Sequence, residues 1–144
     1  MAIRLLLLVA LLFWVSGVKA AEPARGQVLF KQCLGCHAIG PGAKHLYGPQ
    51  LNGVFERPAG SAVGYQYSQA FQTATDGRID WSDETLDQFL ASPQNFMPGT
   101  KMVYPGVGDE RQRADLIAYL RDVGSDGVIP VSYTHLTLPT KRIV

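Results

Sequence analysis

The sequence predicts a small all-α domain whose helices are joined by long loops. Apolar residues recur at helical spacing towards the end of the domain, at Leu116, Tyr119, Leu120 and Val123, which places them on one face of a helix. Two segments carry helix-capping residues, and no stretch between residues 21 and 124 shows the alternation typical of a strand. Long loops normally leave a small domain weakly stable, so we expect the core to contain more than its own side chains.

The first helix is expected over Ala24 to Cys33. Pro23 suits the first turn, where a missing N–H costs nothing. Gly26 lies one turn before Phe30 on the same side of this helix. Because a glycine weakens a helix, its presence here suggests that another backbone approaches closely.

The middle of the chain predicts a loop and then two helices. Residues 38–61 are rich in Gly and Pro, which favours irregular structure. A second helix is expected over Tyr67 to Ala74. A third begins after Trp81 with Ser82 as its N-cap, and Ser92-Pro93 ends it.

An irregular stretch from Gln94 to Gly108 precedes the last helix. It contains two methionines, Met97 and Met102. The last helix starts at Asp109, a good N-cap whose partner Gln112 three residues later approximates a capping box.

The two ends of the chain differ from its middle. Residues 1–20 combine a positive start, an apolar run and a small-residue cleavage site, which predicts a signal peptide. The run is short for a bilayer-spanning helix of about 20 residues, so cleavage is favoured over a membrane anchor. Residues 131–144 have no partner strand and resemble translated sequencing-adapter reads, so we interpret them as a non-native tail. Residues 21–130 then form the single domain.

The domain between these ends is mildly acidic. Of the 13 Lys and Arg residues in the chain, nine lie in residues 21–130, together with all 12 Asp and Glu residues, so the formal charge is near −3. This charge argues against nucleic acid as a partner.

The most informative motif is Cys33-Leu34-Gly35-Cys36-His37. Two thiols separated by two residues and followed by an imidazole form the attachment signature of a c-type haem. Each cysteine can form a thioether with one vinyl group of the porphyrin, and His37 is then positioned to place a ring nitrogen on the iron.

Three other chemistries can use the same residues. Zinc could bind both thiols and His37 with His45 as a fourth ligand, although no second C-x-x-C follows. A redox dithiol would follow a strand in a βαβ unit, and none is predicted around Cys33. A disulfide across so short a loop would be strained.

Two loop features bear on the histidines. A ligating histidine needs an acceptor for its other ring N–H, and the carbonyl of Pro49 is the candidate for His37. We interpret His45 as a loop residue that ties two backbone segments together by hydrogen bonds, rather than as an iron ligand.

Five ordered segments make the chain resemble a class I cytochrome c of the mitochondrial and α-proteobacterial, cytochrome c2-like, type over about residues 23–123. The segments are the C-x-x-C-H motif, residues 48–53 (Gly-Pro-Gln-Leu-Asn-Gly), Trp81, residues 98–102 (Pro-Gly-Thr-Lys-Met) and residues 113–120 (Arg-Ala-Asp-Leu-Ile-Ala-Tyr-Leu). The resemblance implies the small monohaem fold of this class, with crossing N- and C-terminal helices and long loops wrapped around the haem.

The resemblance also implies roles for single residues. Cys33 and Cys36 would hold the thioethers, His37 the proximal nitrogen and Met102 the distal sulfur, while Met97 falls outside the family position and would be a hydrophobic contact. The family positions that engage the haem propionates are matched by Arg57, Tyr67, Trp81 and Thr100, and those of the helix crossing by Gly26, Phe30, Leu116 and Tyr119.

The function implied is that of a soluble, monomeric, periplasmic one-electron carrier, not an enzyme. Its expected partners are membrane cytochrome complexes, oxidases or periplasmic dehydrogenases. Two alternatives stay open: a haem c sensor or enzyme with a labile distal ligand, and a membrane-tethered carrier if the leader is not cleaved.

Overall fold

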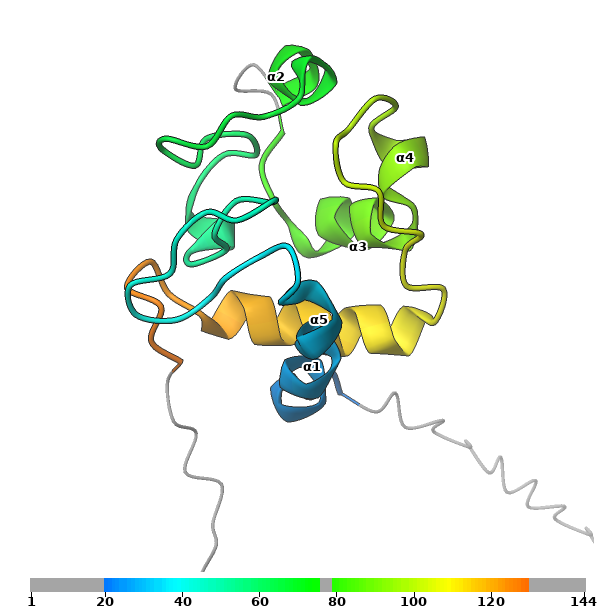
Figure 1. Ribbon diagram of the computed structural model, residues 1–144. Helices are drawn as coiled ribbons and strands as arrows, with labels where there is room; N and C mark the ends of the chain where they lie inside the picture. Colours follow the sequence, from blue (N-terminus) through cyan, green and yellow to red (C-terminus); the bar gives the residue numbers. More distant parts are fainter. Residues whose placement is uncertain (1–19, 76–78, 130–144) are drawn as a thin grey trace, which may run out of the picture.

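The computed structural model describes residues 20–75 and 79–129, and within them the chain is helical (Figure 1). The only β pairing in the described ranges is a single bridge between Pro58 and Asp80. The prediction of an all-α domain with long loops is therefore confirmed. The helices are α1 (Pro23–Leu29), α2 (Gln69–Thr75), α3 (Asp83–Ala91), α4 (Pro93–Phe96) and α5 (Glu110–Asp122).

Helix α1 leads directly into the cysteine motif. Pro23 occupies its first turn, as expected, and the helix tightens into a 3₁₀ turn over Phe30–Cys33. The predicted span of Ala24 to Cys33 is thus helical throughout, with a change of helix type near its end. The motif residues that follow begin directly from this rigid support.

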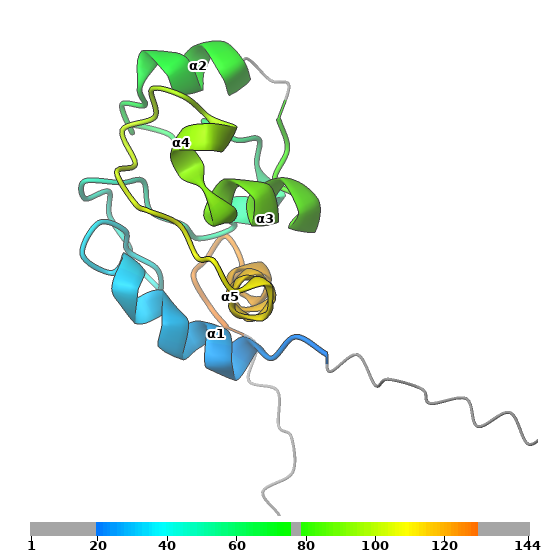
Figure 2. The ribbon, with the colours of Figure 1, turned by 90° about the vertical axis from the view of Figure 1, so that its right-hand side faces the viewer.

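Helices α1 and α5 cross in close contact, and the two views show one across the other (Figures 1 and 2). A Cβ atom on Gly26 would lie 2.0 Å from the carbonyl oxygen of Asp115. Next to this contact, the rings of Phe30 and Tyr119 pack with centroids 5.5 Å apart. Gly26 therefore allows the close backbone approach that its position in a helix predicted.

An ion pair joins the same two helices. Asp115 is almost fully buried and accepts hydrogen bonds from Arg25 Nε at 2.7 Å and from the backbone N–H of Glu22, also at 2.7 Å. The Arg25 guanidinium holds the pKa of the Asp115 carboxyl below its usual range. The carboxylate stays charged at neutral pH and satisfies an N–H at the start of α1.

Helix α3 packs on α5, and both begin at the predicted caps. The Ser82 side chain accepts from the Thr85 N–H and the Thr85 side chain accepts from the Ser82 N–H, which completes a capping box. Asp109 Oδ1 accepts from the Gln112 N–H at 2.9 Å. Since side chains fix these helix starts locally, the sequence alone located them.

Two helix predictions needed correction. Helix α2 begins at Gln69 rather than Tyr67, because the Ser68 hydroxyl caps it by accepting from the Phe71 N–H at 3.1 Å. Helix α4 (Pro93–Phe96) overlaps the start of the stretch predicted to be irregular, Gln94 to Gly108. Pro93 stops α3 but also starts α4, where a proline is favoured in the first turn.

Two long loop segments lie above α5 in Figure 1. The loop over residues 38–61 lies on one side, and the segment that follows α4 (residues 97–109, the methionine segment) lies on the other. Val107 N–H donates to Leu90 O at 2.8 Å and joins the end of this segment to α3. No helix within residues 20–75 or 79–129 is both long and apolar enough to cross a membrane.

We predict that Gly26→Ala destabilises the holoprotein by about 3 kcal/mol, because the added methyl group meets the backbone of α5 and the helices must separate. The measurement is urea unfolding followed by circular dichroism. Gly108→Ala is the matched control, since a Cβ there has no neighbour within 4 Å. Equal unfolding midpoints for the two variants would show that the crossing is not tight.

Candidate functional site

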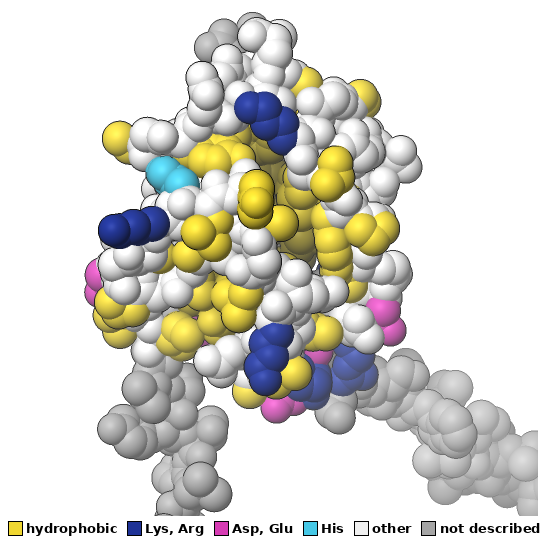
Figure 3. Space-filling model, in the orientation of Figure 1, with side chains coloured by type: hydrophobic (Ala, Val, Ile, Leu, Met, Phe, Trp, Pro, Cys, Tyr) yellow, Lys and Arg dark blue, Asp and Glu magenta, His cyan; other side chains and the backbone are white. Residues whose placement is uncertain are grey.

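A cavity of about 540 Å³ lies between the two loop segments and α5. The space-filling view shows it as a hollow with hydrophobic side chains at its walls (Figure 3). Its interior is formed mainly by aliphatic and aromatic side chains, among them Leu51, Val54, Phe89 and Leu116. The volume and the apolar lining are those of a site for a cofactor or small molecule.

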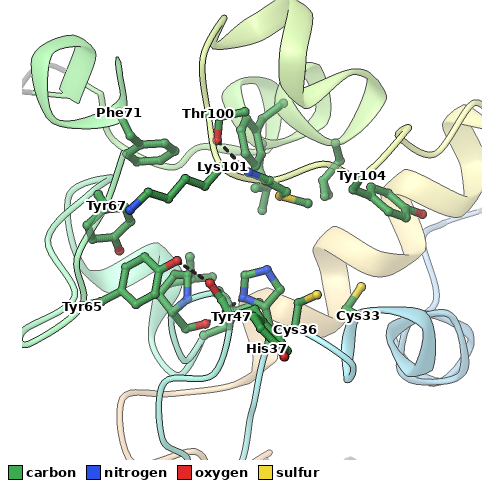
Figure 4. A pocket seen from close by; sticks show the side chains of 18 of the residues that line it. Cys33, Cys36, His37, Tyr47, Tyr65, Tyr67, Phe71, Thr100, Lys101 and Tyr104 are labelled. Atoms are coloured by element: carbon green, nitrogen blue, oxygen red, sulfur yellow. Dashed lines mark hydrogen bonds between the residues drawn. The ribbon is translucent and has the colours of Figure 1, made fainter. Parts of the chain in front are cut away.

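The C-x-x-C-H motif forms one wall of this cavity (Figure 4). The N–H groups of Cys36 and His37 both donate to the carbonyl oxygen of Cys33, at 3.0 and 2.9 Å. This turn brings the three side chains to the same wall. Cys33 is half-buried, Cys36 is exposed, and both thiols are free.

The His37 ring is fixed by two neighbours in the loop. Its Nδ1 lies 2.7 Å from the carbonyl oxygen of Pro49, and because a carbonyl only accepts, Nδ1 holds the proton and Nε2 has the free lone pair. A Cβ on Gly48 would lie 2.3 Å from His37 Cε1, so the ring packs directly on that glycine.

Burial lowers the pKa of His37, although the Pro49 carbonyl opposes this shift. The ring is therefore neutral at physiological pH. A neutral imidazole with its second N–H held by an acceptor is the form in which histidine binds a metal.

Thr100 and Met102 line the cavity from the segment after α4. In Figure 4, Thr100 and Lys101 lie across the cavity from His37 and the two cysteines. Thr100 is buried and its Oγ1 accepts from the Met102 N–H at 3.3 Å. Met97, by contrast, is 2% exposed and belongs to the hydrophobic core, as expected from its place before the Pro-Gly turn.

Arg57, Tyr67 and Trp81 also line the cavity. One guanidinium nitrogen of Arg57 donates to Gln50 O at 3.0 Å, but Arg57 Nε is buried and has no hydrogen-bond partner among the described residues. The Tyr67 hydroxyl accepts from the Ala62 N–H at 3.4 Å. Because a buried N–H donor normally has a partner, we expect Arg57 Nε to meet an acceptor inside the cavity.

No motif or spacing in the sequence indicated that Tyr47, Tyr65 and Tyr104 line the cavity. The Tyr65 hydroxyl donates to Tyr47 O at 2.6 Å, and the Tyr65 ring packs edge-on against Tyr67 with centroids 4.7 Å apart. The Tyr104 hydroxyl donates to Gln32 Oε1 at 2.9 Å and joins the methionine segment to the first helical segment. These contacts join loop residues that are distant in the sequence, so no periodicity or spacing indicates them.

The contacts of His45 argue against it as the fourth ligand of a zinc site. Its Nε2–H donates to Val63 O at 2.9 Å and its Nδ1 accepts from the Gln50 N–H at 3.0 Å, so both ring nitrogens are engaged. This confirms its structural role in the loop. Within the described residues, no three His, Cys, Asp or Glu side chains gather in a group that could hold a metal ion.

Comparisons with known proteins agree with this geometry. The profile of the cytochrome c family matches residues 23–124. Cytochrome c2 of Blastochloris viridis is 43% identical over 113 residues, which cover 78% of this chain and 87% of that protein. Cytochrome c-550 of Ancylobacter novellus is also 43% identical, over 73% of this chain and 98% of that protein.

The chain belongs to the cytochrome c family. The solved structure of cytochrome c2 from Rhodospirillum centenum superposes with a TM-score of 0.68 at 36% identity, covering 72% of this chain and 99% of that one. This cytochrome c is a c2-like electron carrier with a covalently bound haem c, and it exchanges electrons with redox proteins rather than catalysing a reaction.

The cavity fits a haem on observations independent of the comparisons. Two free sulfurs and a neutral imidazole line one wall, and the remaining lining is apolar enough for a porphyrin. Arg57 Nε, which is buried and has no partner in the described part of the chain, suits an anionic acceptor such as a propionate. The residues present therefore offer haem c two sulfurs for covalent attachment, an imidazole for the iron and a cationic donor for a propionate.

We predict that Gly48→Ala displaces the His37 ring, because the new methyl group would overlap Cε1. The hydrogen bond to Pro49 is then lost. NMR of the reduced holoprotein measures this as loss of the slowly exchanging Nδ1–H signal of His37. Gly35→Ala, where a Cβ meets nothing within 4 Å, should keep the signal, and an unaltered signal in both variants would contradict the packing described here.

Proposed function

We propose that this cytochrome c is a periplasmic one-electron carrier whose haem iron is held between His37 and Met102. This proposal rests mainly on the protonation and the fixed orientation of the His37 ring. The ring is neutral and half-buried, and its Nδ1 proton is held by Pro49. Its free Nε2 is thus available as a ligand from one wall, and Met102 lines the cavity from a different segment.

The choice of Met102 over Met97 follows from burial. Met97 is enclosed in the hydrophobic core, whereas Met102 is only half-buried and lines the cavity. His37 and Met102 together would supply two protein ligands to the iron, which would leave no open position for oxygen or substrate. Haem c supplies an iron that accepts and releases one electron, and a soft thioether sulfur favours its reduced form.

The propionates are assigned to the polar residues at the cavity edge. Arg57 offers a buried N–H donor, and Thr100, Tyr67 and Trp81 offer hydroxyl or indole N–H groups along the same lining. Buried carboxylates require such donors or a counter-charge. These residues would orient the porphyrin and stabilise its negative charge.

Electrons are expected to leave at the cysteine side of the cavity. Cys36 is exposed there and Lys31 lies on the preceding 3₁₀ turn. Lys101 lies across the cavity on the methionine segment, with its Nζ donating to Gln66 O at 3.3 Å, and both exposed lysines would border the docking surface. A docking surface of this kind supports brief contacts between monomers and membrane cytochrome complexes, oxidases or periplasmic dehydrogenases.

The proposal includes export of the protein from the cytoplasm. Residues 1–20 are proposed to be a cleaved leader and residues 131–144 a non-native tail, and nearly all of both segments lies outside the described residues. Haem c is attached outside the bacterial cytoplasmic membrane, which agrees with a periplasmic location. The intact mass of the exported protein distinguishes a cleaved carrier from a tethered one, because the tethered form would keep the leader.

We predict that Met102→Ala abolishes the sulfur-to-iron charge-transfer band of the ferric protein and opens the iron to rapid carbon monoxide binding after reduction. Absorption spectroscopy and stopped-flow mixing measure the two effects. Met97→Leu is the control, since a swap of similar volume in the core should leave the band in place. A wild-type protein that lacks the band and binds carbon monoxide rapidly would instead favour the sensor or enzyme.

A further inference from the structure

Gln94 contacts the methionine segment in a way that the proposed function does not use. Its side-chain Nε2 donates to the carbonyl oxygen of Thr100 at 3.0 Å and to that of Met102 at 3.1 Å. A primary amide has two N–H hydrogens, so one side chain can serve both carbonyls. The two carbonyls flank Lys101 and belong to the segment that brings Met102 to the cavity.

These carbonyls lie outside the helices, and no helical hydrogen-bond ladder satisfies them. The segment is tied to the fold at its ends, by a turn in which the Thr100 N–H donates to Met97 O at 3.0 Å and by the bond from Val107 to Leu90. Between these ties, the Met102 backbone has two side-chain contacts. Thr100 Oγ1 accepts from its N–H at 3.3 Å, and Gln94, which lies outside the segment, donates to its carbonyl oxygen.

Gln94 lies on the short helix α4, which is held at both ends. It lies in α4 between Pro93, which is fully buried, and the core residue Met97. The N–H groups of Asn95 and Phe96 both donate to Ser92 O, at 3.1 and 3.0 Å. A short helix fixed at both ends can hold the amide in place even though Gln94 itself is exposed.

We propose that Gln94 is a positioning residue that holds the Met102 backbone so that its sulfur stays on the iron. The inference rests on the proposed ligation by Met102. Without the two hydrogen bonds, the segment between Thr100 and Val107 moves more freely and the sulfur leaves the iron more often. Gln94 thus sets how readily an outside ligand competes for the ferric iron.

Three variants of the holoprotein test this role. Gln94→Leu removes both donors without adding charge. Gln94→Glu keeps the shape but places a carboxylate against two carbonyl oxygens at pH 7. Gln88→Leu is the matched control, because Gln88 is an exposed helical glutamine whose Nε2 reaches Glu84 Oε1 on its own helix at 3.5 Å.

The readouts are imidazole binding to the ferric protein, the sulfur-to-iron charge-transfer band, and exchange of the Met102 amide proton, which is bonded to Thr100 Oγ1. Gln94→Leu should bind imidazole roughly 5- to 30-fold more tightly than wild type at pH 7, as expected for the loss of one to two net hydrogen bonds. Exchange at the Met102 amide should accelerate in parallel, and Gln88→Leu should behave as wild type.

The Gln94→Glu variant adds a pH signature. Its band should be weaker than that of wild type at pH 7 and should recover as the pH falls through about 4.3, where a glutamic acid gains a proton and becomes a donor. A merely structural contact would give no such recovery. Wild type and Gln88→Leu should show no recovery in this pH range.

The outcomes separate this inference from the proposed function. Wild-type band strength together with unchanged imidazole affinity and exchange in Gln94→Leu would overturn the role of Gln94 and leave ligation by Met102 intact. A wild type without the band would overturn both. Failure of both Gln94 variants to give holoprotein, while Gln88→Leu gives it, would also overturn the inference, since a positioning residue leaves the fold intact.

Discussion

The apolar cavity is the constraint on which the rest of this structure depends. About 540 Å³ of space is surrounded by loops and by α5. Several aromatic side chains at its walls pack on one another, as Phe71 does on Trp81, but together they leave this space open. In most small domains such space is filled by interlocking aliphatic groups. Here the covalent haem of the family completes the core, so the loops need little regular structure of their own.

The helices hold the two sides of the cavity in fixed positions relative to each other. The crossing of α1 and α5 at Gly26 fixes the start of the cysteine motif, and α3 with α4 supports the methionine segment opposite it. The His37 ring is locked between Gly48 and the Pro49 carbonyl. A site whose ligands are held from separate rigid supports changes little when one electron is added or removed, which suits a carrier.

The sequence predicted those parts of the structure that local chemistry determines. The starts of α3 and α5 followed from Ser82 and Asp109, and the attachment motif followed from the spacing of its cysteines and histidine. Helix α4 was missed because a proline that ends one helix can also begin another. The contact from Gln94 and that between Tyr65 and Tyr47 were missed because they depend on how loops fold back on each other.

The most direct test of this account compares the holoprotein with a Cys33→Ala, Cys36→Ala chain that cannot attach haem. Urea unfolding followed by far-ultraviolet circular dichroism is the measurement. If the haem forms the centre of the core, the holoprotein unfolds in one cooperative transition and the haem-free chain shows none. A haem-free chain with the helix content of the holoprotein and a cooperative transition of its own would contradict the account.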